Sequence, residues 1–204
     1  MTLSLAAATK HLAASCEVMA ELIPKHTPPS IDPKPPGLYF EVLVSSIIGQ
    51  QLSVKAADTI EARVRAGINP FTPASLARSS PDQLREFGLS NSKANYVIGL
   101  AEAFASGLID PKALAKSTDV EITKSLIQLK GIGPWTVEMF LIFGMGHLDV
   151  WSPGDLGLKK AVWSLFGPDT DPVTISERWR PYRSVAALYL WEHSDANPGL
   201  VAKK

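Results

Sequence analysis

The sequence has one cysteine, no excess of either charge and no long apolar run, and each absence excludes a class of protein. Cys16 is the only cysteine among 204 residues, which excludes a disulfide framework and a four-cysteine zinc or iron–sulfur site. It also indicates a reducing compartment. No apolar run approaches the roughly 18 residues of a membrane helix, and Lys10 and His11 interrupt the first apolar segment of any secretory signal. We therefore expect an intracellular protein, cytoplasmic or associated with the nucleoid, with no membrane partner.

The charges balance, because 20 basic and 20 acidic side chains give a formal net charge of zero. Bulk charge therefore does not indicate a nucleic-acid partner, and any DNA binding has to rely on backbone amides and a local basic face. Apolar residues make up 46% and charged residues 20%, which are ordinary values for globular proteins and exclude a disordered chain. The length suits one domain, or two small lobes that share a site.

The apolar periodicity is helical almost throughout and predicts an all-α fold. The segment 38–51 contains β-branched residues, but no second strand candidate follows closely, so we favour a buried helix over a lone strand. A proline-rich segment, 24–37, predicts an extended connector. The other predicted elements are helices at 3–23, 54–67, 81–88, 93–107, 119–129, 134–146, 156–167 and 181–194, and a polar tail at 197–204.

The most informative stretch is LKGIGPWTVEMF, residues 129–140. One helix ends there, Gly131 and Gly133 flank Ile132, and a new helix begins at Pro134. Glycine permits a positive φ and the close approach of another backbone, and the amides at a helix N-terminus form a phosphate site without a charged side chain. We expect Ile132 to anchor the turn in the core. Taken by itself, the pattern favours a plain helix–helix turn over a DNA-binding hairpin.

A second feature is Asp155, which follows Ser152-Pro153-Gly154 at the start of the helix predicted over 156–167. An N-cap is the ordinary role of an aspartate at this position. The helix dipole would also keep the carboxylate ionised there. Taken alone, Asp155 is more simply explained as a cap than as a catalytic group.

A third feature is the concentration of tryptophan in the last third of the chain. Core packing is the common fate of tryptophan, whereas a cleft lined by several indoles suits a flat or cationic ring. The tryptophans are Trp135, Trp151, Trp163, Trp179 and Trp191.

Together these segments resemble the helix-hairpin-helix (HhH-GPD) DNA glycosylase superfamily, and within it the 3-methyladenine DNA glycosylase II (AlkA-like) branch. The matching segments are LKGIGPWT, DVWSPGDLGLKK and RWRPYRSVAALYLW, with FEVLVSSIIGQQLSVKAADTIEARV and LREFGLSNSKANYVIGLAEAF upstream. The resemblance covers roughly residues 38–193, far more than one motif. It implies two helical lobes, one of residues 38–149 and one of residues 1–37 with 150–204, with the active site in the cleft between them.

The resemblance implies a base-excision repair enzyme that acts on damaged double-stranded DNA. Such an enzyme flips alkylated purines of the 3-methyladenine type out of the duplex and hydrolyses the N-glycosidic bond, leaving an abasic site. Asp155 would be the catalytic carboxylate. It would stabilise the oxocarbenium-like sugar or act as a base on water, and both roles stay open. Asp149 lies before the loop and is expected to be structural.

The resemblance also implies a base pocket of Trp135, Trp191, Met139 and Leu156. The two indole faces would hold a cationic base by cation–π attraction. Met139, Leu156 and Gly157 stand where a relative has larger residues. This difference suggests a roomier or less selective pocket.

The implied DNA contacts are the hairpin residues Gly131, Ile132 and Gly133, together with Gln51 and Leu52. In IIGQQLS, Gln51 aligns with the wedge residue of the family, which fills the gap that a flipped base leaves. For Leu52, a role as wedge and a role as an ordinary turn residue are about equally good interpretations.

Two further expectations concern cations and lysine chemistry. In relatives the hairpin carbonyls hold a monovalent cation, here those of Ile127, Leu129 and Ile132, so a structural Na⁺ or K⁺ is expected and no other cofactor. Bifunctional relatives carry a lysine where this chain has Trp135. We therefore expect a monofunctional hydrolase without AP-lyase activity.

Two other classes of protein stand as alternatives to the enzyme. A non-catalytic helix-hairpin-helix DNA-binding module would not need Asp155 after a Gly/Pro-rich loop. A helical interaction protein with its tryptophans in the core would not need Gly-Ile-Gly at a helix start. We therefore favour the enzyme, acting as a monomer.

Overall fold

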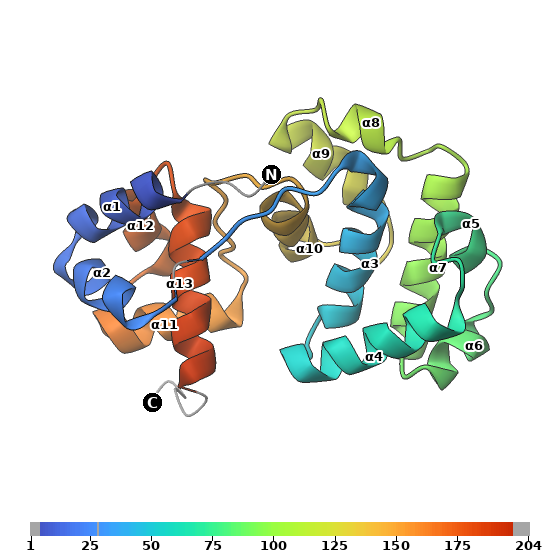
Figure 1. The fold of residues 1–204 in the computed structure, drawn as a ribbon, viewed down its shortest axis with the longest axis horizontal. Coiled ribbons are helices and arrows are strands. Elements are labelled where there is room, and N and C mark those ends of the chain that lie inside the picture. The colour runs from blue at the N-terminus through green and yellow to red at the C-terminus, as the bar shows by residue number, and fades with distance from the viewer. Residues whose placement is uncertain (1–4, 28, 198–204) are drawn as a thin grey trace. The chain divides into compact units, whose positions relative to one another are not determined.

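The structure is a computed structural model that describes residues 5–27 and 29–197 (Figure 1). It is 67% helical, and no β-strand occurs among the described residues, so the predicted all-α fold is confirmed. None of the helices in these ranges has both the length and the apolar character that crossing a membrane requires. The chain forms two compact units, Met1–Pro33 with Gly146–Lys204, and Lys34–Met145.

The first unit joins the two ends of the chain around one core. Figure 1 shows the blue helix α1 beside the red helix α13, and the core between the helices includes Leu12, Met19 and Trp179. The helices of this unit are α1 Ala6–Ser15, α2 Glu17–Leu22, η1 Ile23–Lys25, α11 Leu156–Phe166, α12 Pro172–Ser176, η4 Glu177–Trp179 and α13 Arg183–Ala196.

The single helix predicted at 3–23 is wrong, because the chain breaks at Cys16. Cys16 is extended, with φ −167° and ψ 158°, and the Ser15 hydroxyl donates to the Leu12 carbonyl at 2.6 Å. This local bond competes with continuation of the helix. The break lets Leu12 of α1 and Met19 of α2 enter the same core. The expected start at residue 3, and the predicted tail beyond residue 197, lie outside the described residues.

The second unit is built around α3, which confirms the buried helix predicted at 38–51. Six of its residues are buried, among them Phe40, Leu43 and Ile47. In Figure 1, α3 lies between the green α7 and the gold α10. The helices of this unit are η2 Pro36–Leu38, α3 Tyr39–Gly49, α4 Val54–Gly67, α5 Pro73–Leu76, α6 Pro81–Glu86, α7 Asn91–Ala105, α8 Pro111–Leu114, α9 Asp119–Leu126, α10 Pro134–Met139 and the π-helical η3 Phe140–Gly144.

The helix predicted at 134–146 changes type part of the way along. The α-helical part, α10, ends at Met139, and η3 continues it as a π-helix. The amide of Met145 donates to the carbonyl of Phe140 at 3.0 Å, which is the i→i+5 bond of a π-helix. Such segments occur frequently at functional sites, and η3 lines the concave surface described below.

Candidate active site

Asp155 caps α11, as its position in the sequence predicted. Its Oδ1 accepts a hydrogen bond from the backbone N–H of Leu158 at 2.8 Å. The carboxylate therefore lies at the positive end of an eleven-residue helix, where the helix dipole favours a negative charge. Capping and catalysis do not exclude each other, because the carboxylate stays ionised while it accepts the cap bond.

Trp191 of α13 donates to the same carboxylate oxygen. Its indole Nε1 lies 3.0 Å from Asp155 Oδ1, and both side chains are half-buried. Two N–H donors on a single oxygen restrict rotation of the carboxylate group. Sequence reasoning singled out Trp191 for the face of its ring. The hydrogen bond from the edge of the ring was not foreseen.

Gly157 has no side chain to crowd the hydrogen bond between Asp155 and Trp191. A Cβ at Gly157 would lie 3.1 Å from Asp155 Oδ1 and 3.3 Å from Trp191 Cδ1, closer than most real Cβ contacts. The neighbouring Leu156 is 59% exposed. A larger residue at position 157 would therefore press against both partners of the hydrogen bond.

The loop before Asp155 is held by a buried serine of α13. The Ser184 hydroxyl donates to the carbonyl of His147 at 2.7 Å and accepts from the amide of Val150 at 2.9 Å. Ser184 is fully buried, so these bonds are shielded from water. The same helix thus fixes the loop through Ser184 and the carboxylate through Trp191.

Asp149 is occupied by arginines. Its Oδ1 accepts from Arg183 Nε at 2.8 Å and its Oδ2 from Arg180 at 2.8 Å. These ion pairs join the loop to the start of α13. They support the structural role expected for Asp149.

Three of the five tryptophans serve the first unit internally. Trp151 and Trp179 are buried in its core, with ring centroids 5.4 Å apart. Trp163 donates from Nε1 to the carbonyl of Thr170 at 3.1 Å. The core interpretation therefore applies to Trp151 and Trp179.

The predicted hairpin lies between α9 and α10. Gly131 has a φ of +89°, and a Cβ there would fall 2.1 Å from Cγ of Tyr96, so both conformation and close packing require glycine. Ile132 is 4% exposed, which confirms it as the anchor of the turn. Gly133 is the N-cap residue of α10, and nothing lies within 4 Å of a Cβ built on it.

The carbonyls expected to hold a monovalent cation belong to this turn. The carbonyl of Leu129 accepts a hydrogen bond from the amide of Ile132 at 3.1 Å. A carbonyl oxygen has two lone pairs, so this bond is compatible with cation binding. The cation at Ile127, Leu129 and Ile132 stays a prediction.

The loop between α3 and α4 presents the predicted wedge. Gln51 has a φ of +58° and is the only non-glycine with a positive φ among the described residues. Its side chain is exposed, and Leu52 is 41% exposed. Strained residues of this kind cluster at functional sites, so the conformation of Gln51 is consistent with a DNA-contacting role.

Two residues that sequence reasoning missed hold this loop. Gln50 donates from Nε2 to the carbonyl of Gly131 at 2.9 Å and to the hydroxyl of Thr136 at 3.0 Å. Lys93 donates from Nζ to the carbonyls of Ile48 at 2.8 Å and Gln50 at 2.5 Å, and burial lowers the pKa of Lys93. The loop between α3 and α4, which we call the wedge loop after the role predicted for Gln51, is thus hydrogen-bonded directly to the hairpin.

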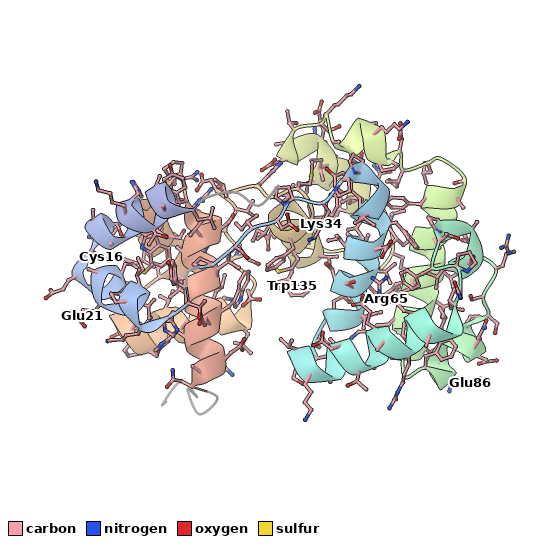
Figure 2. The ribbon with its side chains drawn as sticks, viewed as in Figure 1. Cys16, Glu21, Lys34, Arg65, Glu86 and Trp135 are labelled. Atoms are coloured by element: carbon pink, nitrogen blue, oxygen red, sulfur yellow. The ribbon has the colours of Figure 1, made fainter. Side chains whose placement is uncertain are left out.

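A concave surface, which forms a pocket with a volume of about 560 Å³, lies within the Lys34–Met145 unit. Two of the predicted pocket residues, Trp135 and Met139, line it. Figure 2 labels three of the lining residues, Trp135, Arg65 and Lys34. The lining includes the apolar residues Leu52, Val54, Trp135, Met139 and Phe143 and the charged residues Lys34, Glu41, Asp58, Glu61 and Arg65.

Comparison with known proteins identifies the family of the chain. Residues 44–181 match the family described as HhH-GPD superfamily base excision DNA repair protein. The chain therefore belongs to this superfamily, and the family resemblance noted in the sequence is confirmed. The match spans the wedge loop, the hairpin and Asp155.

Among relatives, the alkylbase DNA glycosidase-like protein mag2 of Schizosaccharomyces pombe is 30% identical over 91% of this chain and 92% of its own length. The putative DNA-3-methyladenine glycosylase YfjP of Bacillus subtilis is 33% identical over 74% of this chain, which spans only 58% of that protein. The structure of the S. pombe 3-methyladenine DNA glycosylase Mag1 in complex with abasic DNA has a TM-score of 0.84 at 30% identity. That match covers 93% of this chain and 97% of Mag1.

Proposed function

We propose that the chain is a base-excision repair glycosylase that removes alkylated purines of the 3-methyladenine type from double-stranded DNA and acts as a monomer. The observation that carries the proposal is the Asp155 carboxylate, fixed at the start of α11 by donors from Leu158 and Trp191. The names of the relatives support it, since they include 3-methyladenine DNA glycosylases of bacteria and yeasts.

In the proposed reaction the bond between C1′ of the sugar and the ring nitrogen of the base breaks first. The electron pair leaves with the base and neutralises the positive charge that alkylation put there, so the base needs little acid catalysis. The sugar becomes oxocarbenium-like, and the ionised Asp155 stabilises it electrostatically. Water then adds to C1′ and loses a proton, and the product is an intact abasic site.

The proposed DNA contacts are made by the hairpin and by the wedge loop. We propose that the amides of Gly131, Ile132 and Gly133 bind a backbone phosphate, and that Gln51 with Leu52 fills the gap in the duplex. Binding of this kind uses few cationic side chains, in keeping with the balanced charge of the chain.

We propose that the base contacts Trp135, Met139, Leu156 and Trp191, the four residues that the family resemblance implies. Trp135 and Met139 belong to the Lys34–Met145 unit. Leu156 and Trp191 belong to the other unit. Leu156 follows Asp155 in the chain, and Trp191 donates a hydrogen bond to Asp155. The indole of Trp135 offers a face for cation–π attraction of about 0.5–2 kcal/mol.

We also propose that the enzyme is monofunctional. A lyase needs an amine that attacks the sugar and forms a Schiff base, and the position where bifunctional relatives carry that lysine is Trp135. Borohydride added during turnover should therefore trap no covalent protein–DNA adduct, and the abasic strand should stay intact without alkali. A trapped adduct would show that another lysine reaches the sugar.

The experiment that tests the proposed function is base release from methylated duplex DNA, with the released bases identified by chromatography. We expect 3-methyladenine and 7-methylguanine in amounts that grow with time and enzyme concentration. Binding to abasic DNA without release of any base would contradict the proposal and support the non-catalytic DNA-binding module.

A further inference from the structure

The concave surface of the Lys34–Met145 unit has a charged wall built from three side chains. Arg65 donates to Glu41 Oε2 at 2.7 Å and, from Nε, to Glu61 Oε1 at 2.8 Å. The Ser45 hydroxyl also donates to Glu61 Oε1, at 2.8 Å. The guanidinium also lies 4.3 Å from the ring centroid of Phe71. The three side chains are thus fixed in one arrangement, which we call the Glu41–Arg65–Glu61 triad.

The triad has an excess negative charge, because two carboxylates meet one guanidinium. Burial acts to lower the pKa of Arg65, but the hydrogen bonds with Glu41 and Glu61 raise the pKa overall, so the guanidinium stays protonated. The side chains are 22–36% exposed. Asp58, a third lining carboxylate, is exposed. Among the lining residues the acidic groups thus outnumber Lys34 and Arg65.

Each carboxylate of the triad keeps one oxygen available. The donors of the triad meet Oε1 of Glu61 and Oε2 of Glu41. Oε2 of Glu61 and Oε1 of Glu41 accept no hydrogen bond from any other described residue. An ionised carboxylate has lone pairs on both oxygens, so each side chain can accept an N–H from a ligand in the cavity.

The remaining lining residues named above are largely apolar, in contrast to the charged triad, and the two kinds of wall together indicate the chemistry of the ligand. Trp135, Met139 and Phe143 are aromatic or polarisable and suit a flat ring. The negative wall repels phosphate and attracts a cation. A planar cation that bears an amine fits both walls, whereas a neutral purine with a carbonyl in place of the amine would set an oxygen lone pair against the carboxylates.

We infer that this cavity selects purines that carry both a positive charge and an exocyclic amine, with Glu41 and Glu61 as the residues that determine the specificity. Alkylated adenine and guanine meet both conditions, and hypoxanthine meets neither. The inference rests on the proposed function and narrows it. It predicts that the roomy pocket suggested by Met139 is selective by charge rather than by size.

The test compares 7-methylguanine with hypoxanthine, each placed in the same duplex, at a mildly acidic pH that keeps the methylated base cationic. Single-turnover release is measured for the unaltered chain and for Glu61→Gln and Glu41→Gln, which keep the shape and remove one charge. Asp58→Asn changes an exposed carboxylate and does not threaten folding. Glu86→Gln, at an exposed position of α6, is the matched control.

We expect release of 7-methylguanine to fall about tenfold in Glu61→Gln and Glu41→Gln and less in Asp58→Asn, as for loss of a nearby charge in a partly exposed site. The unaltered chain should release hypoxanthine more slowly than 7-methylguanine, hypoxanthine release should not fall further in the variants, and Glu86→Gln should act like the unaltered chain. If release of 7-methylguanine is unchanged in all three variants, the inference is wrong but the proposed function stands. The same conclusion follows if the variants slow the release of both bases equally. Failure of the unaltered chain to release either base would contradict the proposed function and this inference with it.

Discussion

The indole Nε1 of Trp191 donates to Asp155 Oδ1 over 3.0 Å, on the same oxygen that accepts the amide of Leu158 at 2.8 Å. The amide bond sets where the carboxylate lies, at the start of α11. The indole bond links it to α13, through a residue that lies 36 positions after the aspartate in the sequence. We therefore regard Trp191 as a positioning residue for Asp155.

Trp191→Phe removes this N–H donor and keeps most of the ring. We expect kcat to fall about tenfold, as for loss of a hydrogen bond to a charged group, with little change in KM. Single-turnover kinetics beside abasic-DNA binding separates the two effects. Trp163→Phe is the control, because it also removes an indole hydrogen bond, to Thr170. Equal slowing in both variants would contradict the positioning role.

Gln51→Gly separates stability from function at the wedge. The φ of +58° is strained for glutamine and easy for glycine. We expect a free energy of unfolding unchanged or higher by up to about 1 kcal/mol, together with slower base release. A fluorescent base analogue beside the lesion would report flipping. Leu52→Ala shows which of the two side chains is the wedge, and full-rate release by Gln51→Gly would exclude Gln51.

Gly131→Ala and Gly133→Ala form a matched pair in the hairpin. The first meets a positive φ and the ring of Tyr96 at 2.1 Å, whereas the second meets open space. We expect Gly131→Ala to lower the free energy of unfolding by about 2–4 kcal/mol, and Gly133→Ala to lower it by less than about 1 kcal/mol. Urea denaturation of both variants gives the comparison. Similar losses would contradict the geometry of the turn.

His193 of α13 predicts a pH dependence of stability. Burial lowers the pKa of His193, and nearby His26 and Lys25 lower it further, although Glu192 pairs with His26 at 3.8 Å. Since the unfolded chain takes up this proton first, near its ordinary pKa of about 6.5, stability should fall as the pH drops below that value. His193→Gln should show a flatter profile in thermal unfolding between neutral and mildly acidic pH. Identical profiles would contradict this prediction.

Much of the fold could be predicted from periodicity, and the failures are local. The long apolar pattern of α3 was sufficient to identify it. The helices α5, α8 and α12 have only four or five residues, too few for a helical period. Each nevertheless begins with proline after a capping threonine or aspartate, a signal that could have found them. The break at Cys16 had no comparable signal.

The candidate site was predictable where it is local in sequence. Asp155 at a helix start and Gly-Ile-Gly before Pro134 are patterns of a few residues. The bond between Gln50 and Gly131 spans 81 residues, and that between Arg65 and Glu41 spans 24. No spacing rule connects such partners, because tertiary packing brings them together.

The most direct test of the account is Asp155→Asn. Asparagine is as good an N-cap as aspartate, so the variant should fold normally and bind abasic DNA with unchanged affinity. It removes the charge that stabilises the developing cation, and single-turnover release of 7-methylguanine should fall about 100- to 1,000-fold. Release within a factor of about three of the unaltered rate, from a folded variant, would be a change of under about 1 kcal/mol in the barrier and would contradict the assignment of Asp155 as the catalytic group.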